Sequence, residues 1–316
     1  MNLWPVAAAA AVLVFTLVSA TPVQQLSFSG AYRPIQQPQK KLRRQNAIKI
    51  HNQPPLRDYL PRETKPQDVK LVNFRNKLYH GPITVGTPGQ QFNVTFDTAT
   101  RKMWLPSVHS PPDKNAYHSP RRYNNASSST YKTNGEAFTA EYELSEVKGY
   151  LSQDIVTVGG FTVKNQVFGE VILESNRFAN HTLQDGIIGL GISNIAENEH
   201  PTVFENMISQ GVLPAPVFSF YFNRYNTDDR DSVLTLGGTN SEYYTGEFTF
   251  ADLIAPNSWN FWVDGVQLPN RYGIYSKRRC QAVVDSVSTF IVGPKDVTDI
   301  LNKMLGGEKI PSSPKL

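Results

Sequence analysis

The chain has 316 residues, with 31 Lys and Arg against 27 Asp and Glu, 40% hydrophobic residues and one cysteine, Cys280. The hydrophobic content is too high for a wholly disordered protein, and the length indicates about two domains. A single cysteine excludes a fold held by disulfides within the chain, and no internal repeat indicates a solenoid.

The N-terminal segment, residues 1–20, is predicted to be a signal peptide. Its apolar run from Val6 to Val18 is short for a membrane span, and Ala20 is a small residue typical of a cleavage site. An uncleaved anchor is the alternative, because no basic residue precedes the run. No later apolar stretch is long enough to span a bilayer. We therefore expect a protein of the secretory pathway, extracellular or endolysosomal, with no membrane contact after cleavage.

Charge divides the chain into a basic leader and an acidic body. Residues 21–80 contain 12 Lys and Arg against three Asp and Glu, whereas residues 81–316 contain 19 against 24. Prolines interrupt the leader, and nucleic acid is not an expected partner of a secreted chain. We interpret residues 21–69 as a removable pro-segment held to its own body by charge. A solvated flexible tail is the alternative.

Beyond Val69, short alternating or apolar runs bounded by Gly, Pro or Asn predict a mostly β protein. The predicted strands are 79–85, 91–96, 138–142, 149–158, 161–168, 218–223, 233–236 and 246–250. Helices are predicted over 201–210 and 294–305, because each begins near a proline and is followed by a glycine.

One motif occurs twice. Residues 94–104 and 282–292 each contain an apolar run that ends in an aspartate, Asp97 and Asp285. A carboxylate at the end of a buried strand needs a partner, and a duplicated unit can bring two of them together about a pseudo-twofold axis. Two carboxylates that share one proton can act as base and acid on one water. The alternative is that each aspartate only stabilises a turn at the end of its strand.

Several blocks of the chain, together with these motifs, resemble in order the pepsin and cathepsin D type of aspartic endopeptidase, over roughly residues 70–306. The further blocks are 79–92, 149–154, 185–191, 203–207 and 236–246. The resemblance implies a mostly β, bilobal pepsin-like aspartic protease fold in which the second lobe is incomplete. An N-terminal β lobe with the first Asp loop and the flap would span 70–222, and a partial C-terminal β lobe with the second Asp loop would span 223–316.

The resemblance also assigns roles around the expected cleft to seven residues. They are the catalytic aspartates Asp97 and Asp285, the bridging hydroxyls Thr98 and Ser286, the flap tyrosine Tyr142, and the supporting residues Thr100 and Trp104. The implied reaction is acid-favoured hydrolysis of internal peptide bonds in a peptide or protein substrate bound between the lobes. The two aspartates would activate a water with no metal or organic cofactor. The chain would be made as a zymogen and act as a monomer.

Four departures from the family pattern predict low or absent activity. Ala99 and Val287 stand where the family has glycines, and side chains at 143–146 replace a small, Gly-rich flap tip. Cys280 lacks its family disulfide partner. Only 31 residues follow Asp285, too few for a counterpart of the strand that supports the first Asp loop. The alternatives to an endopeptidase are therefore a silent homologue that binds peptide or protein in its cleft, and a truncated inactive product.

Two further features concern modification and metal binding. Asn125 and Asn180 lie in glycosylation acceptor motifs, and Asn125 is in a Ser/Asn-rich loop. His109 and His118 have no third ligand nearby, so no zinc site is predicted.

Overall fold

A computed structural model describes most of the chain beyond the leader. The described residues are 66–111, 121–142, 145–174, 184–193, 200–223, 231–246, 248, 250–255, 257–263, 266–267, 274–275, 280–288 and 292–304. The predicted signal peptide, most of the predicted pro-segment, Asn180 and His118 lie outside them. No helix in these ranges has both the length and the apolar character needed to cross a membrane.

Most elements are strands, as the sequence predicts. The strands are β1 (Gln67–Phe74), β2 (Leu78–Val85), β3 (Gln90–Asp97), β4 (Trp104–Pro106), β5 (Lys132–Tyr142), β6 (Ser145–Val158), β7 (Phe161–Glu174), β8 (Gly186–Gly189), β9 (Phe218–Tyr221), β10 (Ser232–Leu236), β11 (Asn260–Val263), β12 (Val266–Gln267), β13 (Ile274–Tyr275) and β14 (Cys280–Val283). The α-helices are α2 (Val203–Ser209) and α3 (Lys295–Met304).

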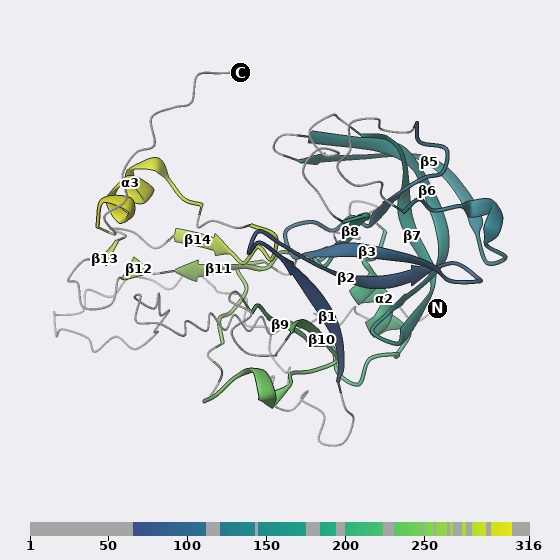
Figure 1. The fold of residues 1–316 in the computed structure, drawn as a ribbon. Coiled ribbons are helices and arrows are strands. Elements are labelled where there is room, and N and C mark those ends of the chain that lie inside the picture. The colour runs from purple at the N-terminus through teal and green to yellow at the C-terminus, as the bar shows by residue number, and fades with distance from the viewer. Residues whose placement is uncertain are drawn as a thin grey trace, which may run out of the picture.

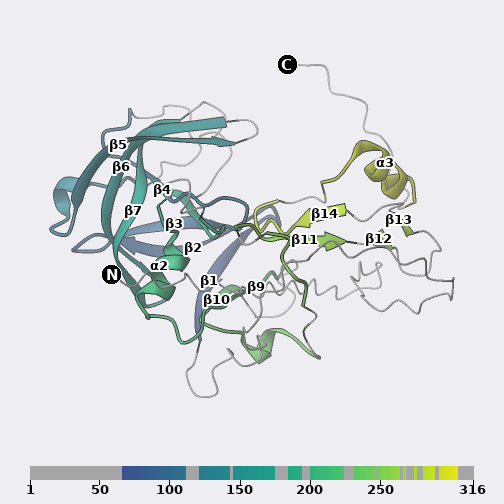
Figure 2. The same ribbon diagram turned by 180° about the vertical axis from the view of Figure 1, so that it is seen from behind.

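The described strands form one large sheet and two small ones. The large sheet has ten strands in the order β5-β6-β7-β4-β8-β3-β2-β1-β10-β9, while β11 pairs with β14 and β12 with β13. Two opposite views place β5 to β7 on one side of β1, and β11 to β14 with α3 on the other (Figures 1 and 2). The mostly β fold predicted from the sequence is confirmed.

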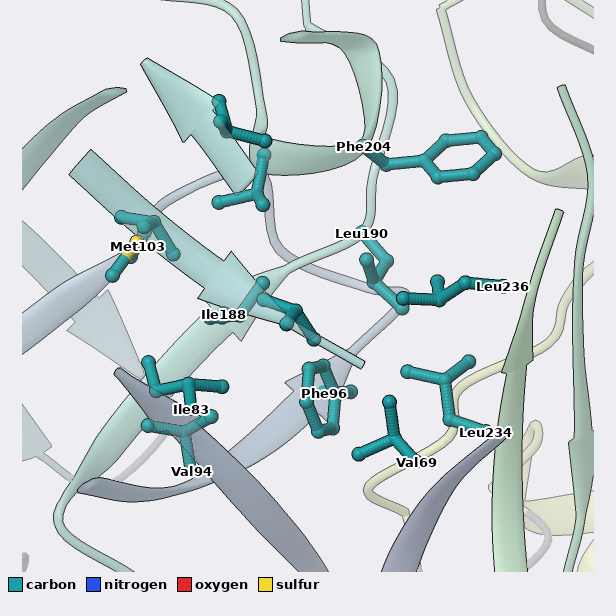
Figure 3. Close-up of a cluster of buried hydrophobic side chains, with 14 of the residues drawn as sticks. Val69, Ile83, Val94, Phe96, Met103, Ile188, Leu190, Phe204, Leu234 and Leu236 are labelled. Carbon is teal, nitrogen blue, oxygen red and sulfur yellow. The ribbon is translucent and has the colours of Figure 1, made fainter. Parts of the chain in front are cut away.

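The main core lies where β1, β3, β8 and β10 come together. These strands contribute Val69, Phe96, Ile188 and Leu234, whose side chains gather in one cluster (Figure 3). Each of the four is at most 3% exposed. Because Phe96 immediately precedes Asp97, burial of this cluster also fixes the end of β3 that carries the first aspartate.

The two predicted helices are confirmed, and α2 shows why. The Thr202 hydroxyl accepts from the Glu205 N–H at 3.3 Å, and the Glu205 carboxylate accepts from the Thr202 N–H at 2.8 Å, which forms a capping box. Val203 and Phe204 are buried. The helix ends before Gly211, whose φ of 64° favours glycine.

The predicted strands differ from the structure in several places. The strand predicted over 246–250 is wrong at its described positions, because Gly246 has a φ of 82° and Phe248 packs against Tyr244 with ring centroids 4.4 Å apart. Strand β1 begins at Gln67, before the expected start of β structure at Val69. Strands β4, β11, β12 and β13 have no predicted counterpart, and β5 to β7 extend beyond the predicted 138–142, 149–158 and 161–168.

Candidate active site

The first candidate aspartate lies at the end of a strand that has a neighbour on each side. β3 pairs with β2 and, in parallel register, with β8, which places Asp97 opposite Gly189. The Leu190 N–H donates to the Asp97 carbonyl at 2.8 Å. A Cβ at Gly189 would lie 2.5 Å from the carbonyl carbon of Arg101, so a glycine is needed for this close approach.

The structure joins the two Asp loops through their hydroxyl residues. The Thr98 N–H donates to Ser286 Oγ at 3.1 Å, and the Ser286 N–H donates to Thr98 Oγ1 at 3.0 Å. The Thr98 hydroxyl also donates to the Val284 carbonyl at 2.6 Å, and the Ser286 hydroxyl donates to the Phe96 carbonyl at 2.6 Å. Each hydroxyl therefore bonds the carbonyl two residues before its counterpart, which is a twofold-symmetric arrangement.

Each aspartate is held by the same local turn. The Ala99 N–H donates to Asp97 Oδ1 at 2.7 Å, and the Val287 N–H donates to Asp285 Oδ1 at 2.9 Å. Ala99 and Val287, at the positions where the resemblance implies glycine, thus make equivalent hydrogen bonds to the two carboxylates. The difference between these positions and glycine is the added side chain.

Asp97 is a buried carboxyl with an altered pKa. Only 7% of the Asp97 surface is exposed to solvent. Its pKa is raised to about 6, chiefly by burial and also by the negative charge of Asp285, while the N–H groups of Ala99 and Thr100 oppose the shift. Asp97 therefore keeps its proton in mildly acidic solution, where an ordinary aspartate is ionised.

The candidate flap tyrosine is held by the candidate supporting tryptophan. Trp104 Nε1 donates to the Tyr142 hydroxyl at 2.6 Å. Tyr142 packs on a cluster that includes Trp104, Phe138 and Val147, and burial raises its pKa. The Thr100 carbonyl accepts from the Gly191 N–H at 2.8 Å, which ties the segment after Asp97 to the end of β8. Of the flap tip at 143–146, residues 143–144 lie outside the described residues.

A lysine to which neither the motif nor the resemblance assigns a role makes one contact near this flap. Lys102 lies two residues before Trp104, and its Nζ donates to the Thr139 carbonyl of β5 at 2.6 Å. The only sequence signal is its place in the segment after Asp97. A charged residue there is typical of an exposed loop, and Lys102 is itself exposed.

Three acids of the first lobe are buried away from the two Asp loops. They are Asp154, Glu170 and Asp185, and each accepts hydrogen bonds from neighbouring groups. Glu170 accepts from the hydroxyls of Ser107 at 2.7 Å and Ser152 at 2.8 Å. These contacts explain how carboxylates are accommodated in the interior.

The other candidate residues lie in different surroundings. Asn125 Nδ2, the atom that would carry a glycan, donates to Glu170 at 3.2 and 3.3 Å, so modification requires it to leave that carboxylate. Cys280 is an exposed free thiol. Within the described ranges no three His, Cys, Asp or Glu side chains form a possible metal site.

The fold and the linked Asp loops define the class as a pepsin-like aspartic protease. A model of the eukaryotic aspartyl protease family matches residues 78–313. The chain is 36% identical to cathepsin D of Dictyostelium discoideum over 238 residues, which is 75% of this chain and 62% of that protein. Against cathepsin D of Clupea harengus it is 36% identical over 246 residues, 78% and 62% of the two chains.

Pepsin A of Suncus murinus is 34% identical over 281 residues, which is 85% of this chain and 71% of that protein. The chain belongs to the eukaryotic aspartyl protease family. It spans about 62% of the length of the two cathepsin D relatives.

Proposed function

We propose that the site between the two Asp loops hydrolyses internal peptide bonds in acid. The observation that carries this proposal is the reciprocal pair of hydrogen bonds between Thr98 and Ser286, because it holds two aspartate turns of the same geometry beside each other. A peptide or protein substrate would lie in the cleft between the lobes.

The proposed reaction needs one protonated and one ionised carboxyl. The raised pKa of Asp97 favours its protonated form, so Asp285 would take a proton from a shared water while Asp97 donates its proton to the peptide carbonyl oxygen. The water oxygen then attacks the carbonyl carbon. Asp285 then gives its proton to the amide nitrogen, a hydroxyl of the tetrahedral intermediate returns a proton to Asp97, and cleavage of the C–N bond releases an amine and a carboxylic acid.

We expect this chain to react slowly, because its two aspartates are supported unequally. β3 lies inside the ten-stranded sheet, whereas β14, which leads to Asp285, pairs only with β11 among the described strands. Val283 in β14 is 51% exposed. A displacement of about 1 Å can cost on the order of a hundredfold in rate. The side chains of Ala99 and Val287 add to this expectation.

The same inequality favours a second candidate function, binding of peptide without cleavage. The Thr98–Ser286 link holds the loops together even where one carboxylate is poorly positioned for attack on the carbonyl carbon. Binding tolerates such misplacement better than catalysis does. A truncated product with neither activity is the third possibility.

The remaining parts of the proposal come from the sequence. The chain would enter the secretory pathway by the signal peptide at 1–20 and reach an extracellular or endolysosomal compartment. It would be a monomeric zymogen with the basic segment 21–69 as its own inhibitor. Asn125 and Asn180 would be its glycosylation sites.

An acid cleavage assay with an inhibitor-binding assay tests the proposal. The full chain after acid treatment should cut denatured globin slowly, and Asp97→Asn should abolish the cleavage. Binding of a pepstatin-type peptide without cleavage would support the second candidate instead. Neither cleavage nor binding by a folded chain would overturn both.

A further inference from the structure

We infer that Lys102 is a positioning residue that ties the flap hairpin of β5 and β6 to the first Asp loop. This inference rests on the proposed function for its catalytic meaning. Two sets of contacts support the inference. The backbone of Lys102 bonds to the segments around Asp97, and the side chain of Lys102 bonds to the flap strand β5.

The backbone of Lys102 is fixed beside the first aspartate. Its carbonyl accepts from the Gly189 N–H at 3.0 Å, and Gly189 is the register partner of Asp97. Its own N–H donates to the Thr100 hydroxyl at 3.3 Å. Movement of Lys102 would therefore disturb the pairing that supports Asp97.

The side chain of Lys102 contacts β5 in two ways. Its ammonium donates to the Thr139 carbonyl at 2.6 Å and lies 5.7 Å from the centre of the Phe138 ring. β5 is the end strand of the large sheet, so it has a neighbouring strand on one side only. A charged donor is a strong partner for a carbonyl on such a strand.

Phe138 lies between Lys102 and β7 and so connects the two. A Cβ at Gly169 would lie 2.3 Å from the Phe138 ring, so β7 packs directly against that ring. Phe138 is thus enclosed by β7 on one side and has the ammonium of Lys102 near its face. The position of the Phe138 ring therefore depends on both β7 and Lys102.

Lys102 and Trp104 hold the flap strand at two points. Trp104 bonds the Tyr142 hydroxyl, and Lys102 bonds the Thr139 carbonyl three residues earlier. Two contacts from one short segment restrict rotation of the hairpin as well as its distance from the Asp loop. Loss of Lys102 should remove one of these two contacts, so the hairpin should open more often.

The test compares Lys102→Met, Lys102→Arg and the matched control Lys132→Met in the full chain. Lys132 is also in β5, and its Nζ donates to Asn165 Oδ1 at 3.1 Å, away from the Asp loop. In Lys102→Met, amide hydrogen exchange in the hairpin strands at 137–142 and 145–150 should rise about tenfold, with β1 unchanged. Lys102→Arg should stay within about twofold of wild type, as should Lys132→Met.

The second readout is dissociation of a pepstatin-type peptide, which should be about tenfold faster from Lys102→Met, with KM raised more than kcat is lowered on a peptide substrate. Unchanged hairpin exchange in Lys102→Met would overturn the inference whatever the activity. Faster exchange with unchanged inhibitor dissociation would overturn the positioning role. A wild-type chain that neither binds nor cuts, with faster exchange in Lys102→Met, would refute the proposed function and leave the tether standing.

Discussion

Thr98 and Ser286, 188 positions apart, each donate a backbone N–H to the other's hydroxyl oxygen. Each hydroxyl then donates to a carbonyl of the opposite loop. All four bonds join the two halves of the duplicated motif. The position of Asp285 relative to Asp97 therefore depends on this small group of polar atoms, in addition to packing.

Thr98→Val should test how much the link stabilises the fold. Valine matches the shape of threonine but leaves the Ser286 N–H and the Val284 carbonyl without their partner, so we expect the free energy of unfolding to fall by about 2 kcal/mol. Urea denaturation measures this change. Thr133→Val, at an exposed position of β5, should change stability by less than about 0.5 kcal/mol. Equal effects of the two variants would contradict the prediction.

Stability should depend on pH through Asp97. Its pKa is about 6 in the folded chain against 3.8 for an ordinary aspartate, so the folded state holds a proton that the unfolded state releases between these values. The stabilisation is complete below about pH 3.8 and is lost as pH rises through about 6. The shift corresponds to roughly 3 kcal/mol.

Asp97→Asn removes this titration because an amide stays neutral. Relative to wild type, the variant should gain roughly 2–3 kcal/mol of unfolding free energy between about pH 3.5 and pH 7.5. Denaturation curves at several pH values measure the difference. Asp231→Asn, at an exposed position, is the control and should show no comparable gain. Parallel stability profiles for wild type and Asp97→Asn would count against the buried, protonated carboxyl.

The sequence predicts the β architecture well where local pattern decides it. Alternating runs bounded by turn residues identify β2, β3 and β10, and proline and glycine punctuation identifies α2 and α3. Strand β1 starts inside the range interpreted as leader, since its pairing with β10, more than 150 residues away, leaves no local trace. The run at 246–250 has strand-like alternation, but its aromatic residues pack in a side cluster.

The residues of the candidate site also fall into two groups, those that the sequence indicates and those that only the fold reveals. The duplicated motif indicates Asp97 and Asp285 from the sequence alone. Lys102 and Glu170 could not be found that way: Lys102 is exposed like most charged residues, and nothing local shows that Glu170 is buried. Their contacts depend on segments that only the fold brings together: β5 for Lys102, and the group of hydroxyls around β7 for Glu170.

Glu170→Ala should be strongly destabilising. The carboxylate is fully buried and accepts from Ser107, from Ser152 and from the Tyr150 hydroxyl at 2.9 Å. Its removal leaves buried donors unpaired and creates a cavity, so we expect a loss of about 3–5 kcal/mol in a denaturation experiment. Glu136→Ala, at an exposed position of β5, should cost less than about 0.5 kcal/mol. A loss below 1 kcal/mol for Glu170→Ala would contradict this account of the cluster.

Val287→Gly should raise peptidase activity more than Ala99→Gly. Both residues keep the N–H bond to their aspartate, so a change to glycine at either position acts by removing the side chain and by giving the backbone more freedom. Val287 is the bulkier residue, and it lies in the loop whose leading strand has a single described partner. We expect kcat/KM on a peptide substrate to rise about tenfold for Val287→Gly and less than about threefold for Ala99→Gly, mainly through kcat.

Val292→Gly is the matched control, because Val292 is 84% exposed and its loss should leave kcat/KM unchanged. Thermal unfolding of all three variants shows whether a glycine has simply loosened the chain. If both Asp-loop variants stay folded and neither gains activity, these side chains do not limit the reaction. The flap hairpin would then be the element to alter next, since it is the other part of the cleft that departs from the family pattern.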